Sequence, residues 1–293
     1  MTPPPPPASG RFRLAIPNKG RLLEPTLRLL RDTGLVFDSP ERALVSQCEN
    51  SPIDILFVRT EDIAEFVNDA VAEAGITATN LVAESGRPVP VVVELGFGRC
   101  RLDAAVPVDS AVMRVEDLRG RRVATSHPRT TERFFGERGI AVEIVPISGA
   151  VEAAPRMGLA DGIVDLVSSG TTLLMNGLRP VGTLLESEAV MVAGPSAGGD
   201  HAEVLDQLRM MLEAVVAGRR RKYLMMNAPR TALEEIEAIL PGLESPSILP
   251  LAHEWMVAVH AVVEADEVWR LLAPLRAAGA SGILVVPIEK LVP

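Results

Sequence analysis

The sequence predicts an α/β protein with two larger lobes and a small C-terminal module. Short apolar strands alternate with helical patterns along the chain, which is typical of α/β domains with mainly parallel sheets. Aromatic residues make up only 3% of the chain, so its cores are expected to consist of Ala, Val, Leu and Ile. The length of 293 residues suits two or three domains, because one domain usually has about 100–200 residues.

The first lobe is expected to span residues 11–102 together with 180–200. An apolar strand is predicted at 12–17. A helix follows at 21–33 and ends at Gly34, a residue suited to the left-handed C-cap position. The remaining elements are a strand at 53–58, a helix at 61–69, further strand–helix alternation at 74–82 and 90–95, and a strand at 189–193.

The second lobe is expected at 103–179, followed by a linker helix at 201–218 and a module at 219–293. The elements expected in the second lobe are strands at 122–125, 142–146 and 162–167 and helices at 131–138, 151–159 and 171–177. Those of the module are strands at 222–227, 254–263 and 282–287 and helices at 231–240 and 267–278. We interpret this module as the β-α-β-β-α-β order of ferredoxin-like domains.

Composition and termini exclude several functional classes. The net charge of -9 predicts no basic surface for a nucleic acid. Cys48 and Cys100 lack metal-knuckle spacing and are expected to be free thiols in a reducing cytosol. Neither a membrane helix nor a signal peptide is recognisable, so we expect a cytoplasmic protein without membrane partners. Residues 1–10, with five successive prolines, are expected to form a disordered or polyproline leader; a docking motif is the alternative.

A hydroxyl-rich loop follows the strand that ends at Val167. The loop and the start of the next helix read Ser168, Ser169, Gly170, Thr171 and Thr172. Backbone N–H groups at a helix start bind anions, glycine permits close approach, and hydroxyls add donors. The pattern predicts a cradle for a monophosphate, and a simple Ser/Thr helix cap is the alternative.

Acidic and basic side chains accompany this loop. Asp165 lies in an apolar strand, where a charge is costly unless it is used or paired, and Glu152 precedes it. Both carboxylates suit ribose hydroxyls, and an ion pair with Arg156 is the alternative. Lys19 and Arg21 open the first helix, where they suit a pyrophosphate or triphosphate; a solvated basic turn is the alternative. Four further strand-end or loop residues are candidates to face the ligand: Arg59, Asp62, Arg99 and Arg101.

Together these segments resemble the ATP phosphoribosyltransferase family in its long form, over roughly residues 11–293. The segments that carry the resemblance are 16–22, 59–63, 75–77, 95–100, 124–128, 151–178, 222–230, 240–246 and 279–284. The resemblance implies two periplasmic-binding-protein-like (type II) lobes around a cleft and an ACT-like regulatory domain. It also implies transfer of phosphoribosyl from phosphoribosyl pyrophosphate to N1 of ATP, a requirement for Mg²⁺, inhibition by histidine, and homo-oligomers from dimers to hexamers.

The resemblance also implies roles for individual residues. Residues 168–172 would hold the 5-phosphate, while Glu152 and Asp165 would hold the ribose or order its metal-bound pyrophosphate. Mg²⁺ would be held through the pyrophosphate, with Asp165 as a candidate ligand. Four other residues would meet the phosphates or position the nucleotide: Lys19, Arg21, Arg59 and Asp62. The histidine pocket would be lined by Asn227, Leu243, Ser247, Val262 and Gly282, for which turn and core roles are the alternative.

The chain departs from the family pattern at three positions. His127, expected near the nucleotide, stands where the family often has tyrosine. Ala78 and Asn80 stand where the family has glycine and aspartate. These departures leave details of the first lobe open, and protonation of His127 is expected to make binding sensitive to pH.

Three other functions are alternatives to phosphoribosyl transfer. A solute-binding module would use the same two-lobed cleft without chemistry. An effector domain of a transcription regulator would need a DNA-binding module, and none is recognisable. A catalytically inactive homologue is disfavoured by the complete 151–178 segment.

Overall fold

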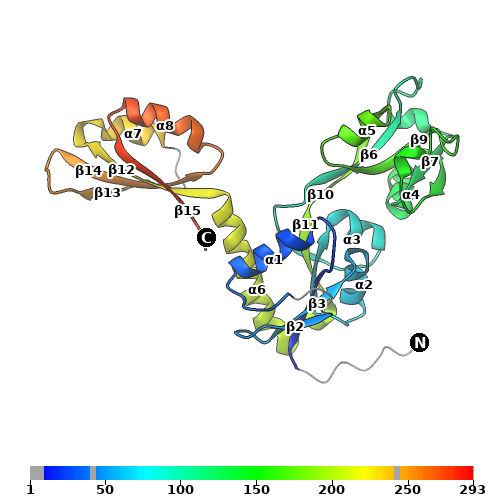
Figure 1. Cartoon of the computed structure of the whole chain (residues 1–293), viewed down its shortest axis with the longest axis horizontal. Coiled ribbons are helices and arrows are strands. Elements are labelled where there is room, and N and C mark those ends of the chain that lie inside the picture. The colour runs from blue at the N-terminus through cyan, green and yellow to red at the C-terminus, as the bar shows by residue number, and fades with distance from the viewer. Residues whose placement is uncertain (1–9, 40–43, 241–244, 293) are drawn as a thin grey trace. The chain divides into compact units, whose positions relative to one another are not determined.

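The computed structural model describes residues 10–39, 44–240 and 245–292 (Figure 1). They form two compact units. One comprises Met1–Arg31 with Leu35–Asp206, and the other comprises Asp32–Gly34 with Gln207–Pro293. No helix in the described part of the chain combines the length and apolar character that a membrane span requires. The predicted leader (apart from Gly10) and Leu243 lie outside the described residues.

The first lobe is built on a six-stranded sheet in the order β2-β3-β1-β4-β11-β5. Its strands are β1 Phe12–Pro17, β2 Val45–Gln47, β3 Ile53–Val58, β4 Ala74–Ala78, β5 Val91–Glu94 and β11 Ala189–Ala193. Its helices are α1 Leu23–Asp32, α2 Ile63–Asn68 and α3 Thr79–Ser85, with a 3₁₀ turn η1 at Thr60–Asp62. Only the β1–β3 and β1–β4 pairs are parallel, so the sheet is mixed rather than mainly parallel.

Helix α2 packs directly against this sheet because Gly75 has no side chain. A Cβ atom built at Gly75 would press on the Ile63 side chain and lie 3.1 Å from the Val67 side chain and 3.3 Å from the Ala15 carbonyl oxygen. Ile63 and Val67 are fully buried here, in a core that includes Ala15 of the central strand. The predicted helix at 61–69 therefore covers one face of the sheet.

The second lobe is built on a five-stranded sheet in the order β10-β6-β9-β7-β8. Its strands are β6 Cys100–Pro107, β7 Arg122–Thr125, β8 Glu143–Pro146, β9 Gly162–Val167 and β10 Leu178–Ser187. Its helices are α4 Pro128–Glu137 and α5 Thr171–Met175, with 3₁₀ turns η2 Val115–Leu118 and η3 Val151–Ala153. Along β6, alternate residues enter two cores on opposite faces of the sheet, Leu102 and Ala104 in one and Ala105 in the other.

The chain crosses between the two lobes twice, once before β6 and once after β10. These two strands pair antiparallel from Cys100 opposite Ser187 to Pro107 opposite Leu178. The boundary expected at residue 180 falls within β10, which belongs to the second sheet. Register shifts between Pro180 and Gly182 and between Thr183 and Leu185 interrupt the pairing.

The other unit contains most of helix α6 Ala202–Arg219 and a four-stranded sheet. After α6 come β12 Arg221–Pro229, α7 Leu233–Ile239, β13 Ser247–Pro250, β14 Met256–Glu264, α8 Val268–Ala277 and β15 Ser281–Pro287, with the 3₁₀ turn η6 Arg230–Ala232 between β12 and α7. The 3₁₀ turns η4 Pro195–Ala197 and η5 Gly199–His201 precede α6 and belong to the first unit. The sheet order β13-β14-β12-β15 confirms the ferredoxin-like prediction. Helices α7 and α8 cover one face, where Ile236, Leu271 and Leu275 pack against Leu224 and Met226 (Figure 1).

The predicted helix at 151–159 is wrong. The chain forms only the short turn η3 there, followed by turns to Leu159. Pro155 has no N–H to donate, and Gly158 takes a left-handed conformation with φ +71°, so a regular helix cannot continue. The outer strand of the module, β13, was also not delimited from the sequence.

Candidate functional site

The loop after β9 forms a small cavity at the C-terminal end of this central strand of the second sheet. Gly170 has φ +79° and turns the chain into α5, while the Ser169 hydroxyl lies 3.0 Å from the Thr171 hydroxyl. The cavity has a volume of about 130 Å³ and is lined by Glu152, Asp165, Leu166, Val167, Ser168, Ser169, Gly170, Thr172 and Leu173. Almost all the residues predicted for phosphate and ribose therefore share one cavity, and Thr171 adjoins it in the loop.

Two carboxylates share this cavity with the hydroxyl groups. Burial raises the pKa of Asp165, and the nearby charge of Glu152 raises it further. The Leu166 N–H donates to the Asp165 carboxylate at 2.8 Å, which acts in the opposite direction. The neighbours that set this pKa are thus a second acid and a backbone amide. A site of this kind favours a cation or hydroxyl donors between the two carboxylates.

A basic side chain from the first lobe reaches the same loop. Gly20, with φ +83°, forms the turn between β1 and α1 that carries Lys19 and Arg21. One terminal nitrogen of Arg21 lies 3.4 Å from Ser168 Oγ, and the other lies 2.9 Å from Cys100 Sγ. Lys19 is exposed on the same turn. The fold thus brings the β1–α1 turn, the start of β6 and the 168–172 loop together.

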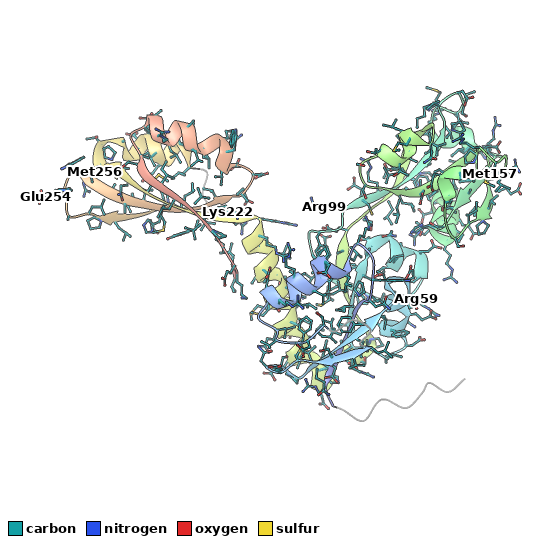
Figure 2. The ribbon with its side chains drawn as sticks, viewed as in Figure 1. Arg59, Arg99, Met157, Lys222, Glu254 and Met256 are labelled. Carbon is teal, nitrogen blue, oxygen red and sulfur yellow. The ribbon has the colours of Figure 1, made fainter. Side chains whose placement is uncertain are left out.

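A larger cavity of about 600 Å³ also borders the loop at Ser168. It is lined by Thr79, Glu94, Arg99, Cys100, Arg101, Val167, Ser168, Glu186, Ser187 and Glu188. Arg99 lies 3.6 Å from Glu188, and Figure 2 shows Arg99 at the connection that leads into β6. Sequence reasoning found Arg99 and Arg101 but missed the glutamates, which end β5, lie in β10 and follow β10 without forming a recognisable motif.

Arg59 and Asp62 line neither of these cavities. Both are exposed around the short turn η1 at the end of β3, and Arg59 is labelled in Figure 2. The structure therefore places these two predicted residues on the first lobe, apart from the residues gathered around the loop.

His127 is buried between the lobes, with only 5% of its surface exposed. Asn80 Nδ2 lies 2.9 Å from His127 Nε2, and Ser126 Oγ lies 3.0 Å from Nδ1. This pattern fits a neutral ring that accepts on Nε2 and donates from Nδ1. Burial lowers the pKa of His127, and the charge of Glu84 opposes the shift. In this arrangement both ring nitrogens are occupied by protein groups.

Acid is expected to destabilise the first unit through His127. Because its folded-state pKa is lowered, the unfolded chain binds the proton more readily, so stability is lost as pH falls below about 6.5 toward the folded pKa. Melting temperatures of the native protein and His127→Gln, measured from about pH 8 to about pH 5.5, test this. The melting temperature of the native protein should fall further with acid than that of His127→Gln. Equal falls in the two proteins would contradict the assignment of this acid sensitivity to His127.

The residues expected to bind histidine lie in the C-terminal unit. Asn227 and Val262 lie on the sheet face that α7 and α8 do not cover, because each alternates with residues of the buried core. Ser247 lies opposite His260, which is on the same face of β14 as Val262. Gly282, at the start of β15, lines a separate cavity of about 600 Å³ beside Trp269 and Arg276. A Cβ atom built at Gly282 would lie 3.7 Å from Asn227 Nδ2, so these two residues are neighbours across the β12–β15 pair.

Over the described residues, His, Cys, Asp and Glu side chains do not gather in groups of three or more that could hold a metal ion. The carboxylates of Glu152 and Asp165 nevertheless supply oxygen donors of the kind that Mg²⁺ prefers, together with oxygens from a substrate.

Comparisons with known proteins cover both units. A family model described as "HisG: ATP phosphoribosyltransferase" matches residues 59–214, and one described as "HisG, C-terminal domain" matches residues 218–290. An ATP phosphoribosyltransferase of Gemmatimonas aurantiaca is 47% identical over 292 residues, which is 96% of this chain and 100% of the relative. One of Methanosarcina barkeri is 40% identical over 289 residues, with the same two coverages. A solved ATP phosphoribosyl transferase (HisG:HisZ) complex from Thermotoga maritima has a TM-score of 0.60 and 27% identity, over 69% of this chain and 98% of that chain.

Proposed function

The chain belongs to the ATP phosphoribosyltransferase family, and on this premise we propose that it transfers the phosphoribosyl group of phosphoribosyl pyrophosphate to N1 of ATP. Pyrophosphate is released, and the reaction is the first step of histidine biosynthesis. The observation that carries the proposal is the cavity that joins the 168–172 loop to Glu152 and Asp165. It offers donors for a monophosphate beside acceptors for vicinal hydroxyls, as a ribose 5-phosphate requires.

The phosphoribosyl group is proposed to bind with its 5-phosphate in the loop. Gly170 lets the phosphate approach the backbone, and hydroxyls of Ser168, Ser169, Thr171 and Thr172 donate to it. Glu152 and Asp165 accept hydrogen bonds from the ribose hydroxyls or hold the cation that accompanies the pyrophosphate. Mg²⁺, when bound, neutralises negative charge that grows on the leaving pyrophosphate.

The basic turn of the first lobe is proposed to face the pyrophosphate and the nucleotide phosphates. Arg21 already contacts the loop through Ser168, and Lys19 is carried by the same turn. The adjoining 600 Å³ cavity, with Arg99 and Arg101 in its wall, is the space offered to the nucleotide. Arg59 and Asp62 are proposed to help position the nucleotide from the first lobe.

The chemistry requires alignment and charge stabilisation rather than a protein nucleophile. Adenine N1 attacks the anomeric carbon of the ribose as the bond to pyrophosphate breaks. Positive charge develops on the sugar, beside the two carboxylates, and negative charge develops on pyrophosphate, beside Arg21 and Lys19. Holding both substrates in line supplies much of the remaining acceleration. No covalent intermediate is expected.

Histidine is proposed to inhibit the enzyme by binding to the C-terminal unit. Asn227, Ser247 and Val262 would contribute from the uncovered sheet face, with Gly282 and Leu243 as further candidates. We also propose that the enzyme forms dimers that assemble into hexamers. We further propose that the enzyme acts in the cytoplasm.

The proposal predicts an activity that a single assay detects. The full-length protein with ATP, phosphoribosyl pyrophosphate, Mg²⁺ and pyrophosphatase should form phosphoribosyl-ATP, followed by its ultraviolet absorbance, and histidine should suppress it. Product insensitive to histidine would refute the regulatory assignment alone. Folded protein that binds either substrate without forming product would refute the transferase and favour a binding module.

A further inference from the structure

Helix α3 of the first lobe and helix α4 of the second lie next to one another in Figure 1. A side chain of each helix caps an end of the other. The Glu84 carboxylate accepts hydrogen bonds from the N–H groups of Arg129 at 3.0 Å and Thr130 at 2.9 Å, and from the Thr130 hydroxyl at 2.8 Å. In return, the Arg129 guanidinium donates to the Ser85 carbonyl at 2.6 Å. An acid thus caps the N-terminus of α4, and a base caps the C-terminus of α3.

A buried hydrogen-bond network reinforces this contact. Asn80 in α3 bonds His127, the residue before α4, as described above. The Asn80 N–H donates to Ser187 Oγ at 3.1 Å, and the Ser187 hydroxyl donates to Asn80 Oδ1 at 2.8 Å. Asn80 is only 1% exposed, so these polar groups have no water to replace a lost partner. Both lobes and the end of β10 are therefore tied through one side chain.

The network continues into the wall of the 600 Å³ cavity. Ser187 and Thr79 line that cavity, and the Thr79 N–H donates to the Glu188 carbonyl at 3.0 Å. The covalent connection between the lobes, by contrast, runs through β6 and β10, whose pairing is interrupted twice. Besides this connection, the contacts between α3 and α4 join the two lobes through side chains, as Arg21 does at Ser168 and Cys100.

We propose that Asn80, Glu84, His127 and Arg129 form a latch that holds the two lobes at their working separation, and that Glu84 is a positioning residue for the phosphoribosyl transfer. The latch aligns the loop at 168–172 with the basic turn at Arg21 on the other lobe. His127 acts through Asn80 in this role and not on the nucleotide. The expected effect of the latch on the transfer rate rests on the proposed function, whereas its effect on the distance between the lobes does not.

The test compares Glu84→Ala with Glu132→Ala, which removes an exposed glutamate from α4, the helix that Glu84 of α3 caps. Glu84→Gln, which keeps an acceptor oxygen, serves as the conservative variant. Spin labels on Asp69→Cys and Glu137→Cys, exposed on the first and second lobe, report the distance between lobes by pulsed electron resonance. The native thiols are buried, and burial raises the pKa of the Cys48 thiol to about 11, so labelling favours the introduced residues.

In the full-length protein, Glu84→Ala should broaden the distance distribution and lower kcat at least 10-fold, with Glu84→Gln between it and the native protein and Glu132→Ala unchanged. An unchanged distribution in folded Glu84→Ala would overturn the latch. A broadened distribution with unchanged kcat would overturn the positioning role. If the native protein lacked transferase activity, the distances alone would still decide whether the latch exists.

Discussion

Replacing Asp165 with asparagine should lower the rate of phosphoribosyl transfer roughly 100-fold or more while the protein remains folded. The carboxylate is proposed to accept ribose hydroxyls or to hold the cation beside the pyrophosphate, and the amide of asparagine presents one acceptor in place of two. The side chains have nearly the same shape, so the Leu166 N–H keeps its partner. Rates under saturating and limiting phosphoribosyl pyrophosphate measure the loss.

Stability should change in the opposite direction from activity. The pKa of Asp165 is raised in the folded state, so its contribution to stability is present below the unfolded pKa and is lost as pH rises through the folded pKa. At neutral pH the charged carboxylate therefore costs stability, and the neutral amide removes that cost. Asp165→Asn should melt at a temperature equal to or above that of the native protein.

A surface substitution provides the control for this prediction. Asp109→Asn removes an exposed carboxylate from the same lobe and should leave both rate and melting temperature unchanged. Asp165→Asn with native activity would refute the proposed role of the carboxylate. A lower melting temperature would instead contradict the argument that Asp165 carries an uncompensated charge.

Replacing Gly75 with alanine should destabilise the first unit by about 2–3 kcal/mol. The added methyl group would press on Ile63 and lie 3.1 Å from the Val67 side chain, among fully buried residues of the core. The Ala15 carbonyl oxygen closes the remaining side at 3.3 Å and belongs to the central strand β1, so the sheet cannot give way. Urea denaturation measures the loss in free energy of unfolding, provided that both proteins unfold with the same m-value.

The same substitution at Gly136 should have the opposite sign. Gly136 lies in helix α4, and a Cβ atom there would have no heavy atom within 4 Å. Alanine favours a helix interior over glycine by about 1 kcal/mol, so Gly136→Ala should stabilise the protein. Equal effects at the two positions would show that general glycine entropy, and not packing of α2, governs Gly75.

Local chemistry made part of the site predictable. The loop at 168–172 combines the glycine and hydroxyls that an anion cradle needs, and Asp165 is conspicuous because its neighbours in β9 are apolar. The ferredoxin-like module is predicted from the order of its strands and helices, and the strands are recognisable because buried residues alternate with less buried ones through β14 and the second half of β12. In each case the signal lies within a few residues of the feature that it predicts.

The connection between the lobes gave no such signal. Strand β10 contains Pro180 and Gly182 and two register shifts, which break the alternation of exposed and buried residues. In β6 the buried Asp103 interrupts an otherwise apolar run. The capping of α4 by Glu84 joins residues separated by 45 or 46 positions, and no sequence pattern in either helix predicts the contact with the other. Such long-range contacts are set by the assembled fold.

The order of strands in the first sheet has a consequence for synthesis of the protein on the ribosome. Strand β11 lies between β4 and β5, yet it follows the whole second lobe in sequence. Strand β5 pairs only with β11 among the strands described, so it must wait without a partner until residue 193 has emerged. The second lobe is continuous from Cys100 to Ser187 and can close its own sheet first. The later half of the nascent catalytic unit therefore folds before the earlier half is complete.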